Sequence, residues 1–409
     1  MWAHGQVCRS RAFGKRFGSG GGVVIPCLYV GVFLRASADM LVYAYLPFHF
    51  HNHMGETRLW VIGLFVGAPS LVRLAVSPLW GKYADRVGRQ RALITGGLLA
   101  YAMLLFLLPR YTEPMQVVTV ASLMAVLSSA FNPVSRVWLL LSSSGQGLRR
   151  LANWHQWEAA GYLVSSVTIG WVVNSGYLDL TEIPLLLCML LVTSAVVIGL
   201  FLPDIPVRSP GWQVEERSKA PVLPHWAYSR ISVFPHTALI YLLASSLTWE
   251  VVATTFGLYF TGLLGGSIRL YGLLIGTSTF LSVLAYGSLA GFCQRRGHRQ
   301  VLQIAAWGYT AMYLLMSYPS VSTASCAYLL PMSSVVRTAM NGLVANQVPE
   351  RHRGEAMGLV DSVEAGSVAW GAILGGLIAH RQGLAFIPKV AVAGSILLHM
   401  LVPRTGKRR

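Results

Sequence analysis

The chain has 409 residues, of which 54% are hydrophobic and only 11% are charged. Soluble domains carry roughly a quarter of charged residues, so this composition excludes an ordinary water-soluble globule. The formal net charge of +17 would suit a nucleic-acid binder. However, most lysines and arginines fall in the two tails and in every second segment between apolar runs, which is the asymmetry of the positive-inside rule.

Apolar runs of about twenty residues recur along the chain, and each is long enough to cross the hydrocarbon core of a bilayer. They predict spans at 23–48, 59–80, 92–109, 115–141, 153–176 and 183–202 in a first half. The second half follows with 236–262, 270–293, 300–318, 321–347, 355–379 and 384–403. The sequence therefore predicts an all-α membrane protein with about twelve transmembrane helices in two six-helix bundles.

The predicted bundles comprise residues 23–202 and 236–403, and three segments lie outside them. Residues 1–22 form a basic N-terminal tail and residues 404–409 a basic C-terminal tail. Residues 203–235 contain several prolines, charges of both signs and no long apolar run, which is typical of a linker. Taking the basic side as cytoplasmic, we predict a multi-pass plasma (inner) membrane protein with both termini in the cytoplasm.

The two halves carry charged residues in the same order within their spans. An acid lies in the first span of each half, at Asp39 and Glu250. An arginine lies in the fourth span of each half, at Arg136 and Arg337. Internal repetition is typical of several polytopic membrane folds, so we expect the two bundles to be related by pseudosymmetry.

The segment between the second and third spans carries the clearest motif of the chain. It reads Gly81-Lys-Tyr-Ala-Asp85-Arg86-Val-Gly88-Arg89-Gln-Arg91. The two glycines permit a tight turn, and the arginines favour the cytoplasmic side. The carboxylate would be stabilised beside a helix N-terminus. This loop resembles the signature between helices two and three of the major facilitator superfamily.

The resemblance implies a twelve-helix secondary transporter that works by alternating access around a midplane site. It also implies that Asp85 lies near the start of the eleventh helix, at about Gly354, and stabilises the outward-open state. The second half has Gln294 where the aspartate would be, so this charge lock would act in one half only. Helix five lacks the glycine-proline pattern of drug/proton antiporters, which leaves drug efflux as an alternative.

Ionisable residues inside the spans are the candidate site, because a charge near the bilayer centre is costly unless it faces a cavity or a partner. Arg35 and Asp39 are four residues apart and share a helix face, as a structural ion pair or as part of a proton site. In the family fold, helices one, four, seven and ten line the pathway. The resemblance therefore places the acids and arginines of the repeat on it. Protonation of one acid would free an arginine for an anionic substrate group.

Four further residues complete the candidate set. Asp361 and Glu364 are three residues apart, so they share a face of the predicted eleventh helix. Either could take part in coupling or pair with the basic loop that precedes the helix. Trp249 and Asn341 lie close in sequence to charged span residues and are candidates for substrate contact, although such side chains more often pack or anchor a helix.

The sequence contains little that indicates a metal-binding protein or an enzyme. His49, His51 and His53 alternate at the outer end of the first span, where they would serve a solvated loop, a pH-sensitive gate or a metal. The five cysteines are scattered and predict no disulfide framework. No nucleophile elbow, phosphate loop or zinc-protease helix occurs in the sequence. We therefore expect no metal site, no cofactor and no enzymatic activity.

The sequence as a whole predicts a proton-coupled symporter or antiporter of a small organic solute. It would act as a monomer in contact with lipid, without a nucleic-acid partner. Two alternatives remain open: a multidrug efflux antiporter of the same fold, and a transport-incompetent membrane sensor or assembly protein.

Overall fold

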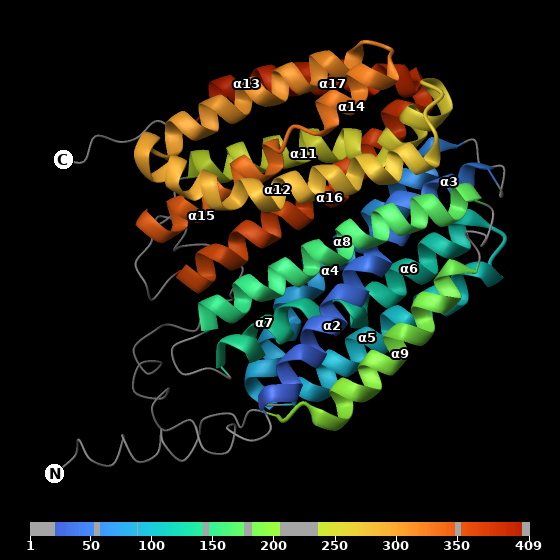
Figure 1. The fold of residues 1–409 in the computed structure, drawn as a ribbon, viewed down its shortest axis with the longest axis vertical. Coiled ribbons are helices and arrows are strands. Elements are labelled where there is room, and N and C mark those ends of the chain that lie inside the picture. Colours follow the sequence, from blue (N-terminus) through green and yellow to red (C-terminus); the bar gives the residue numbers. More distant parts are fainter. Residues whose placement is uncertain are drawn as a thin grey trace. The chain divides into compact units, whose positions relative to one another are not determined.

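A computed structural model describes residues 21–52, 58–87, 89–141, 147–175, 182–204, 236–347 and 353–402. The regular structure of these residues is helical throughout, as the apolar runs predict (Figure 1). Within the described ranges, nine helices are long and apolar enough to cross a membrane. The all-helical membrane fold is therefore confirmed.

Helices also occupy the three predicted spans outside this set of nine. They are α8 (Gly147–Ser175), α13 (His298–Ser317), and the pair α14 (Val321–Tyr328) and α15 (Met332–Gln347). Polar residues lower the hydropathy of α8 and α13, and α14 and α15 are each short. The number of spans, about twelve, stays a prediction.

The first of two compact units comprises residues 1–46 and 75–205. In it, α2 (Gly21–Met40) packs against α8 and α9 (Ile183–Phe201), and α5 (Gln90–Leu107) packs against α9, α6 (Pro114–Ser128) and α7 (Phe131–Leu141). The π-helical turn η1 (Leu41–Tyr45) extends α2, and the 3-10 turn η2 (Leu108–Arg110) follows α5. Gly161 brings α8 close to α2, because a Cβ there would lie 2.9 Å from the Cβ of Ala36.

The last described residues of the first unit are tied to two of its helices. The backbone amide of Arg91, in the first turn of α5, donates to Oδ1 of Asp204 at 2.8 Å. The side chain of Arg89, at the N-cap position, makes no capping bond. The indole of Trp138 in α7 donates to the carbonyl of Pro203 at 2.9 Å. Asp204 thus satisfies a donor that a local N-cap would otherwise satisfy.

The second unit comprises residues 47–74 and 206–409. Here α11 (His236–Leu258) packs along α16 (Arg353–Gln382) and α17 (Ile387–Leu401), while α15 packs against α13 and α12 (Ile268–Arg296). The π-helical turn η5 (Tyr259–Leu263) extends α11, and the 3-10 turn η7 (Leu384–Phe386) precedes α17. Gly297 separates α12 from α13 with φ +80°, a conformation that glycine adopts without steric cost.

Residues 47–74 pack with the second unit, although the predicted first bundle (23–202) includes them. They contain α3 (Leu46–Asn52) from Pro47 onward and the first part of α4 (Leu59–Val87). A Cβ on Gly63 of α4 would lie 2.5 Å from the carbonyl of Ala372 and 3.1 Å from the Cα of Gly376. Small residues on both helices permit this close approach in α4 and α16.

The fourth predicted span is broken in both units. In the first unit α6 gives way to α7, and in the second α14 gives way to α15. Each repeat arginine lies in the segment after the break. Carbonyls at the breaks accept side-chain donors, since Ser128 accepts from Arg35 at 3.5 Å and Tyr328 accepts from Ser278 at 3.0 Å. The breaks are therefore stabilised by bonds from other helices.

The motif between the second and third spans is more helical than predicted. α4 continues to Val87 and α5 begins at Gln90, so Gly81 lies inside a helix and the tight turn predicted there is wrong. A helix can continue past the end of an apolar run, because its backbone hydrogen bonds do not depend on surrounding hydrocarbon and its charged side chains can be solvated. Gly88 lies outside the described residues.

Candidate functional site

Arg35 and Asp39 form a buried ion pair in the first unit, as their spacing on α2 predicts. The guanidinium Nη2 lies 3.3 Å from Oδ1 of Asp39, and the two residues are 3% and 7% exposed. The hydroxyl of Tyr101 in α5 donates to the same carboxylate oxygen at 2.6 Å. The guanidinium also lies 3.7 Å from the centre of the Tyr101 ring. This cluster joins α2 to α5 and leaves little room for an exchange of partners.

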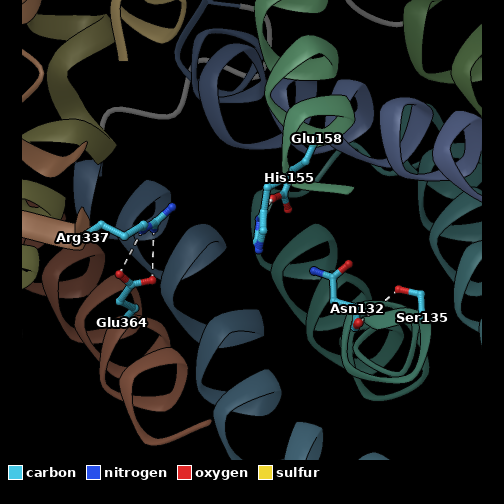
Figure 2. Close-up of polar contacts among 6 residues, drawn as sticks. All are labelled: Asn132, Ser135, His155, Glu158, Arg337 and Glu364. Atoms are coloured by element: carbon cyan, nitrogen blue, oxygen red, sulfur yellow. Dashed lines mark hydrogen bonds and ion pairs between the residues drawn. The ribbon is translucent and has the colours of Figure 1, made fainter. Parts of the chain in front are cut away.

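Arg136 lies on α7 against the neighbouring helix α8. Its guanidinium carbon is 4.5 Å from the ring centre of Trp154, a fully buried side chain. This geometry is a cation–π contact. One residue further along α8, His155 lies 3.1 Å from Glu158, a residue of the same helix face (Figure 2). The first unit therefore places Arg136 beside the indole of Trp154, and Trp154 is close in sequence to a further acid, Glu158.

Arg337 and Glu364 form the main charged contact of the second unit, between α15 and α16 (Figure 2). Nε of Arg337 donates to Oε1 of Glu364 at 3.2 Å, and Nη2 donates to Oε2 at 3.0 Å. The pair is therefore bidentate. The side chain of Arg337 is 54% exposed and that of Glu364 is 22% exposed. Unlike the pair in the first unit, this pair is partly exposed.

Both members of the Arg337–Glu364 pair lie deep along their helices. Arg337 precedes the end of α15 by about ten residues, and Glu364 follows the start of α16 by about the same number. At 1.5 Å per residue, each lies roughly 15 Å from that helix end. In a membrane-spanning helix, exposed charges at this depth are tolerated where they face water or a polar partner.

Glu250 lies on the face of α11 that packs against α16. A Cβ on Gly371 would lie 2.5 Å from the Cβ of Glu250, so the two backbones are in close contact there. Seven residues separate Gly371 from Glu364, which places both on one face of α16 two turns apart. The charges that act most strongly on Glu250 are those of Glu364 and Arg337. The second unit thus holds two acids and one arginine in one electrostatic cluster.

Aromatic side chains surround this cluster. Tyr309 and Tyr313 of α13 and Tyr328 of α14 all interact electrostatically with Glu250. The ring of Tyr328 lies 5.5 Å from the ring of Trp249 and stacks on that of Phe256 at 4.6 Å. Trp249 therefore has a packing partner, and a role in substrate contact stays a prediction.

The remaining predicted residues are placed less fully. Asn341 and Asp361 lie on α15 and α16, and their side chains are outside the described part of the structure, as are those of Asp85 and Arg86 in the last turns of α4. Of the three outer histidines, only His51 has a described side chain, which is exposed. Among the described residues, no group of three His, Cys, Asp or Glu could hold a metal ion.

Two parts of the charged clusters were not predicted from the sequence. Tyr101 was missed, although a tyrosine within an apolar span usually finds a hydrogen-bond partner and could have been considered for that reason. The contact between Arg337 and Glu364 was missed because it joins different helices and has no signal in local spacing. Both residues were candidates separately.

Comparison with known proteins agrees with the fold. The chain matches the Major Facilitator Superfamily over residues 28–372. It resembles the nucleoside transporter NupG, with a TM-score of 0.71, 14% identity, and coverage of 92% of this chain and 98% of that one. It also resembles the human organic anion transporter MFSD10 (TETRAN), with a TM-score of 0.63, 16% identity, and coverage of 93% and 99%.

A shorter match occurs with the Staphyloferrin B transporter of Staphylococcus aureus (strain NCTC 8325 / PS 47). The identity is 32% over 80 residues, which is 20% of this chain and 19% of that protein. This match spans about a fifth of the relative, so it says little about shared substrates.

The helical fold, with its many apolar helices and charged residues inside them, defines a multi-pass membrane transporter rather than an enzyme. The chain belongs to the major facilitator superfamily. The resemblance inferred from the motif between the second and third spans is thereby confirmed.

Proposed function

We propose that this protein is a proton-coupled secondary transporter of a small organic solute that carries a carboxylate or another anionic group. It works by alternating access of two six-helix bundles, joined by the linker at 203–235, in the plasma membrane with both termini in the cytoplasm. The observation that carries this proposal is the exposed Arg337–Glu364 pair in the same unit as Glu250. No cofactor, metal or second protein enters the mechanism.

The charge of the second unit's cluster supports an anionic substrate and proton coupling together. One guanidinium binds a carboxylate through two parallel hydrogen bonds, a geometry that favours planar anions. Two acids beside one arginine leave a net negative charge when both are ionised, and like charges in a low-dielectric site favour uptake of a proton. Protonation of one acid therefore frees the arginine for an anion, which couples the binding of a proton to the binding of the substrate.

The similar proteins are compatible with this substrate class. One solved neighbour is described as an organic anion transporter and another as a nucleoside transporter. These likenesses are at low identity and establish the fold alone. The carboxylate preference rests on Arg337 and its partner.

A flux measurement in reconstituted liposomes tests the proposed function. Purified protein is first screened by thermal shift against organic acids, nucleosides and amino acids, and each solute that stabilises it is then assayed for flux under an imposed pH gradient. We expect accumulation that follows the gradient and stops when a protonophore dissipates it. Flux that ignores the gradient would exclude proton coupling. Absence of flux for every stabilising solute would favour a sensor or assembly protein.

A further inference from the structure

We propose that α12, α13 and α17 form a binding site for one anionic diacyl phospholipid on the exposed surface of the second unit. Arginines at the turn between α12 and α13 bind the headgroup phosphate, and a polar and aromatic stripe on α13 contacts the ester groups and the upper acyl chain. The site uses none of the residues of the charged cluster around Arg337, so it goes beyond the proposed function and does not depend on it.

The first part of the site is a group of arginines at the turn between two helices. Arg295 and Arg296 lie in the last turn of α12, and Arg299 lies in the first turn of α13. All three residues are exposed, and none of them has an acidic partner among the residues that the structure describes. Guanidinium groups bind phosphate oxygens through paired N–H donors. The turn is therefore suited to the phosphate of a lipid headgroup.

One face of α13 continues from these arginines along the helix. Arg299, Gln303 and Trp307 are spaced four residues apart, so their side chains lie one above the other. Trp307 lies roughly 12 Å from Arg299 along the helix axis, and its side chain is exposed. The interfacial layer of a bilayer is roughly 5–8 Å thick on each side, so this stripe is long enough to reach from a phosphate to an upper acyl chain.

His399, in the last turn of α17, fixes the polar middle of the stripe. The amide of Gln303 donates to Nδ1 of His399 at 2.9 Å, so Nε2 carries the ring hydrogen and donates to Oγ1 of Thr310 at 3.2 Å. The hydroxyl of Thr310 in turn donates to the carbonyl of Ala306 at 3.0 Å. The centres of the His399 and Trp307 rings are 4.3 Å apart. These contacts join α13 to α17, which lie side by side (Figure 1).

The polar stripe lies on an otherwise apolar surface. Ile304 of α13 and Leu397 and Met400 of α17 are exposed large side chains beside it. Polar groups on such a surface are stabilised in a membrane where they reach the interface or a polar partner. The amide of Gln303 carries a second N–H besides the one given to His399, and this N–H suits a lipid ester oxygen.

Charge and surface together favour an anionic phospholipid over the other sources of phosphate. A soluble anion would contact the arginines alone, whereas a diacyl lipid also covers the apolar surface below them. Phosphatidylcholine carries a trimethylammonium group, which neighbouring arginines repel. Clusters of basic residues beside membrane helices attract anionic lipids. The occupant that satisfies both parts of the site is therefore an anionic diacyl lipid.

Native mass spectrometry of the detergent-solubilised full-length protein tests the headgroup part of the site. One phosphatidylglycerol should bind more tightly than phosphatidylcholine. R299Q should weaken this binding about fivefold, which is the contribution expected of one arginine near an anionic lipid. The control R269Q removes an exposed arginine at the other end of α12 and should bind as the wild type does. Equal affinity for the two lipids, or equal affinities of R299Q and R269Q, would overturn the site.

Competition separates a lipid from a soluble anion. Inorganic phosphate offers similar oxygens without acyl chains, so it should not displace phosphatidylglycerol from the wild type at equal concentration. Displacement at equal concentration would identify a site for soluble phosphate and refute the lipid assignment. Both measurements are made without flux, so their outcome is independent of whether the protein transports an organic anion.

Fluorescence quenching in nanodiscs tests whether the lipid lies beside Trp307. The difference in emission between the wild type and W307F isolates this tryptophan, and the same subtraction with W370F isolates the exposed Trp370 of α16 as a control. A small fraction of phosphatidylglycerol brominated in its upper acyl chains should quench Trp307 more strongly than the same fraction of brominated phosphatidylcholine. Trp370 should be quenched equally by both lipids. Equal quenching of Trp307 by the two lipids would refute the site, even if phosphatidylglycerol binds elsewhere on the protein.

Discussion

Arg35 and Arg337 each bind a carboxylate of their own unit, but their surroundings differ. Arg35 is 3% exposed and has an aromatic ring, a carbonyl and Asp39 as partners. Arg337 has a bidentate carboxylate and an exposed side chain. A buried charge that loses its partner is left without solvation, whereas an exposed charge can be solvated by water. The same residue types therefore lead to different expectations for mutants.

Replacement of Asp39 by asparagine should destabilise the protein rather than change its pH dependence. The substitution leaves the guanidinium of Arg35 buried without a counter-charge, which costs about 3 kcal/mol or more. Thermal unfolding in detergent should show a clearly lower Tm for D39N. The variant Y101F removes only one hydrogen bond and should cost about 1–2 kcal/mol. A D39N protein of normal stability that has lost proton coupling would contradict this assignment.

Replacement of Asp204 by alanine should weaken the start of α5. The carboxylate accepts the amide of Arg91, and loss of such a cap costs about 1 kcal/mol. Asp204→Asn keeps an acceptor oxygen and should cost less. Hydrogen exchange at the first turn of α5 is the direct measurement. Equal protection in the wild type and the alanine variant would show that the contact contributes nothing.

The sequence predicts contacts within one helix better than contacts between helices. The pairing of Arg35 with Asp39 follows from spacing on one helix, and the structure confirms it. The contacts of Arg337 with Glu364 and of Arg136 with Trp154 join residues on different helices. Such contacts depend on how helices are rotated about their axes, which an almost uniformly apolar span does not specify.

At the scale of helices, the contact between α11 and α16 sets the position of Glu250. Gly371 has no side chain, and the Cβ of Glu250 occupies the space where one would lie. Gly375 allows the same close approach to the backbone of Val251. The small residues spaced along α16 therefore have a packing role, since they permit close contact between helices in lipid.

Replacement of Gly371 by alanine should separate α11 from α16 and destabilise the second unit. The added methyl group would lie 2.5 Å from the Cβ of Glu250, and overpacking of this kind costs about 1–3 kcal/mol. Gly96 in α5 is the matched control, because a Cβ there meets no atom within 4 Å. The variant G96A should unfold at the wild-type temperature or slightly above it. Equal Tm values for G371A and G96A would refute the close contact.

The extent of the helices was predicted well, but their interruptions were not. The apolar runs at 115–141 and 321–347 did not indicate that the fourth span of each half contains a break. Interruption of a helix depends on which other donors reach its freed carbonyls, as Ser278 does at Tyr328. Those donors belong to other helices, so the sequence of the interrupted span alone does not reveal the break.

At the scale of the whole molecule, the distribution of basic residues predicts the orientation in the membrane. A fluorescent protein fused to the C-terminus should fold and fluoresce, because that end is predicted to be cytoplasmic. Alkaline phosphatase fused after Arg110, in a predicted outer loop, should be active, and the same enzyme fused after Arg299 should be inactive. Activity of the second fusion with inactivity of the first would reverse the predicted orientation.

Composition and the apolar runs were enough to predict the membrane class and the helical fold, and the motif between the second and third spans was enough to predict the family. They were not enough to predict the grouping of residues 47–74 with the second unit. That grouping depends on Gly63 and on the small residues of α16 that it contacts. Glycines within an apolar run do not indicate which helix will use the space they leave.

The break before Arg337 has a mechanical consequence. Short-range bonds connect residues 327–335 across it, from Leu330 to Ala327, from Met332 to Leu330 and from Val335 to Pro331. Within residues 321–347 the helical hydrogen bonds do not run continuously from α14 into α15, so a change in the angle between the two helices would not require a regular helix to break. A tilt of α15 by a few degrees would displace the guanidinium of Arg337, so binding of an anion by this group would be coupled to movement of α15.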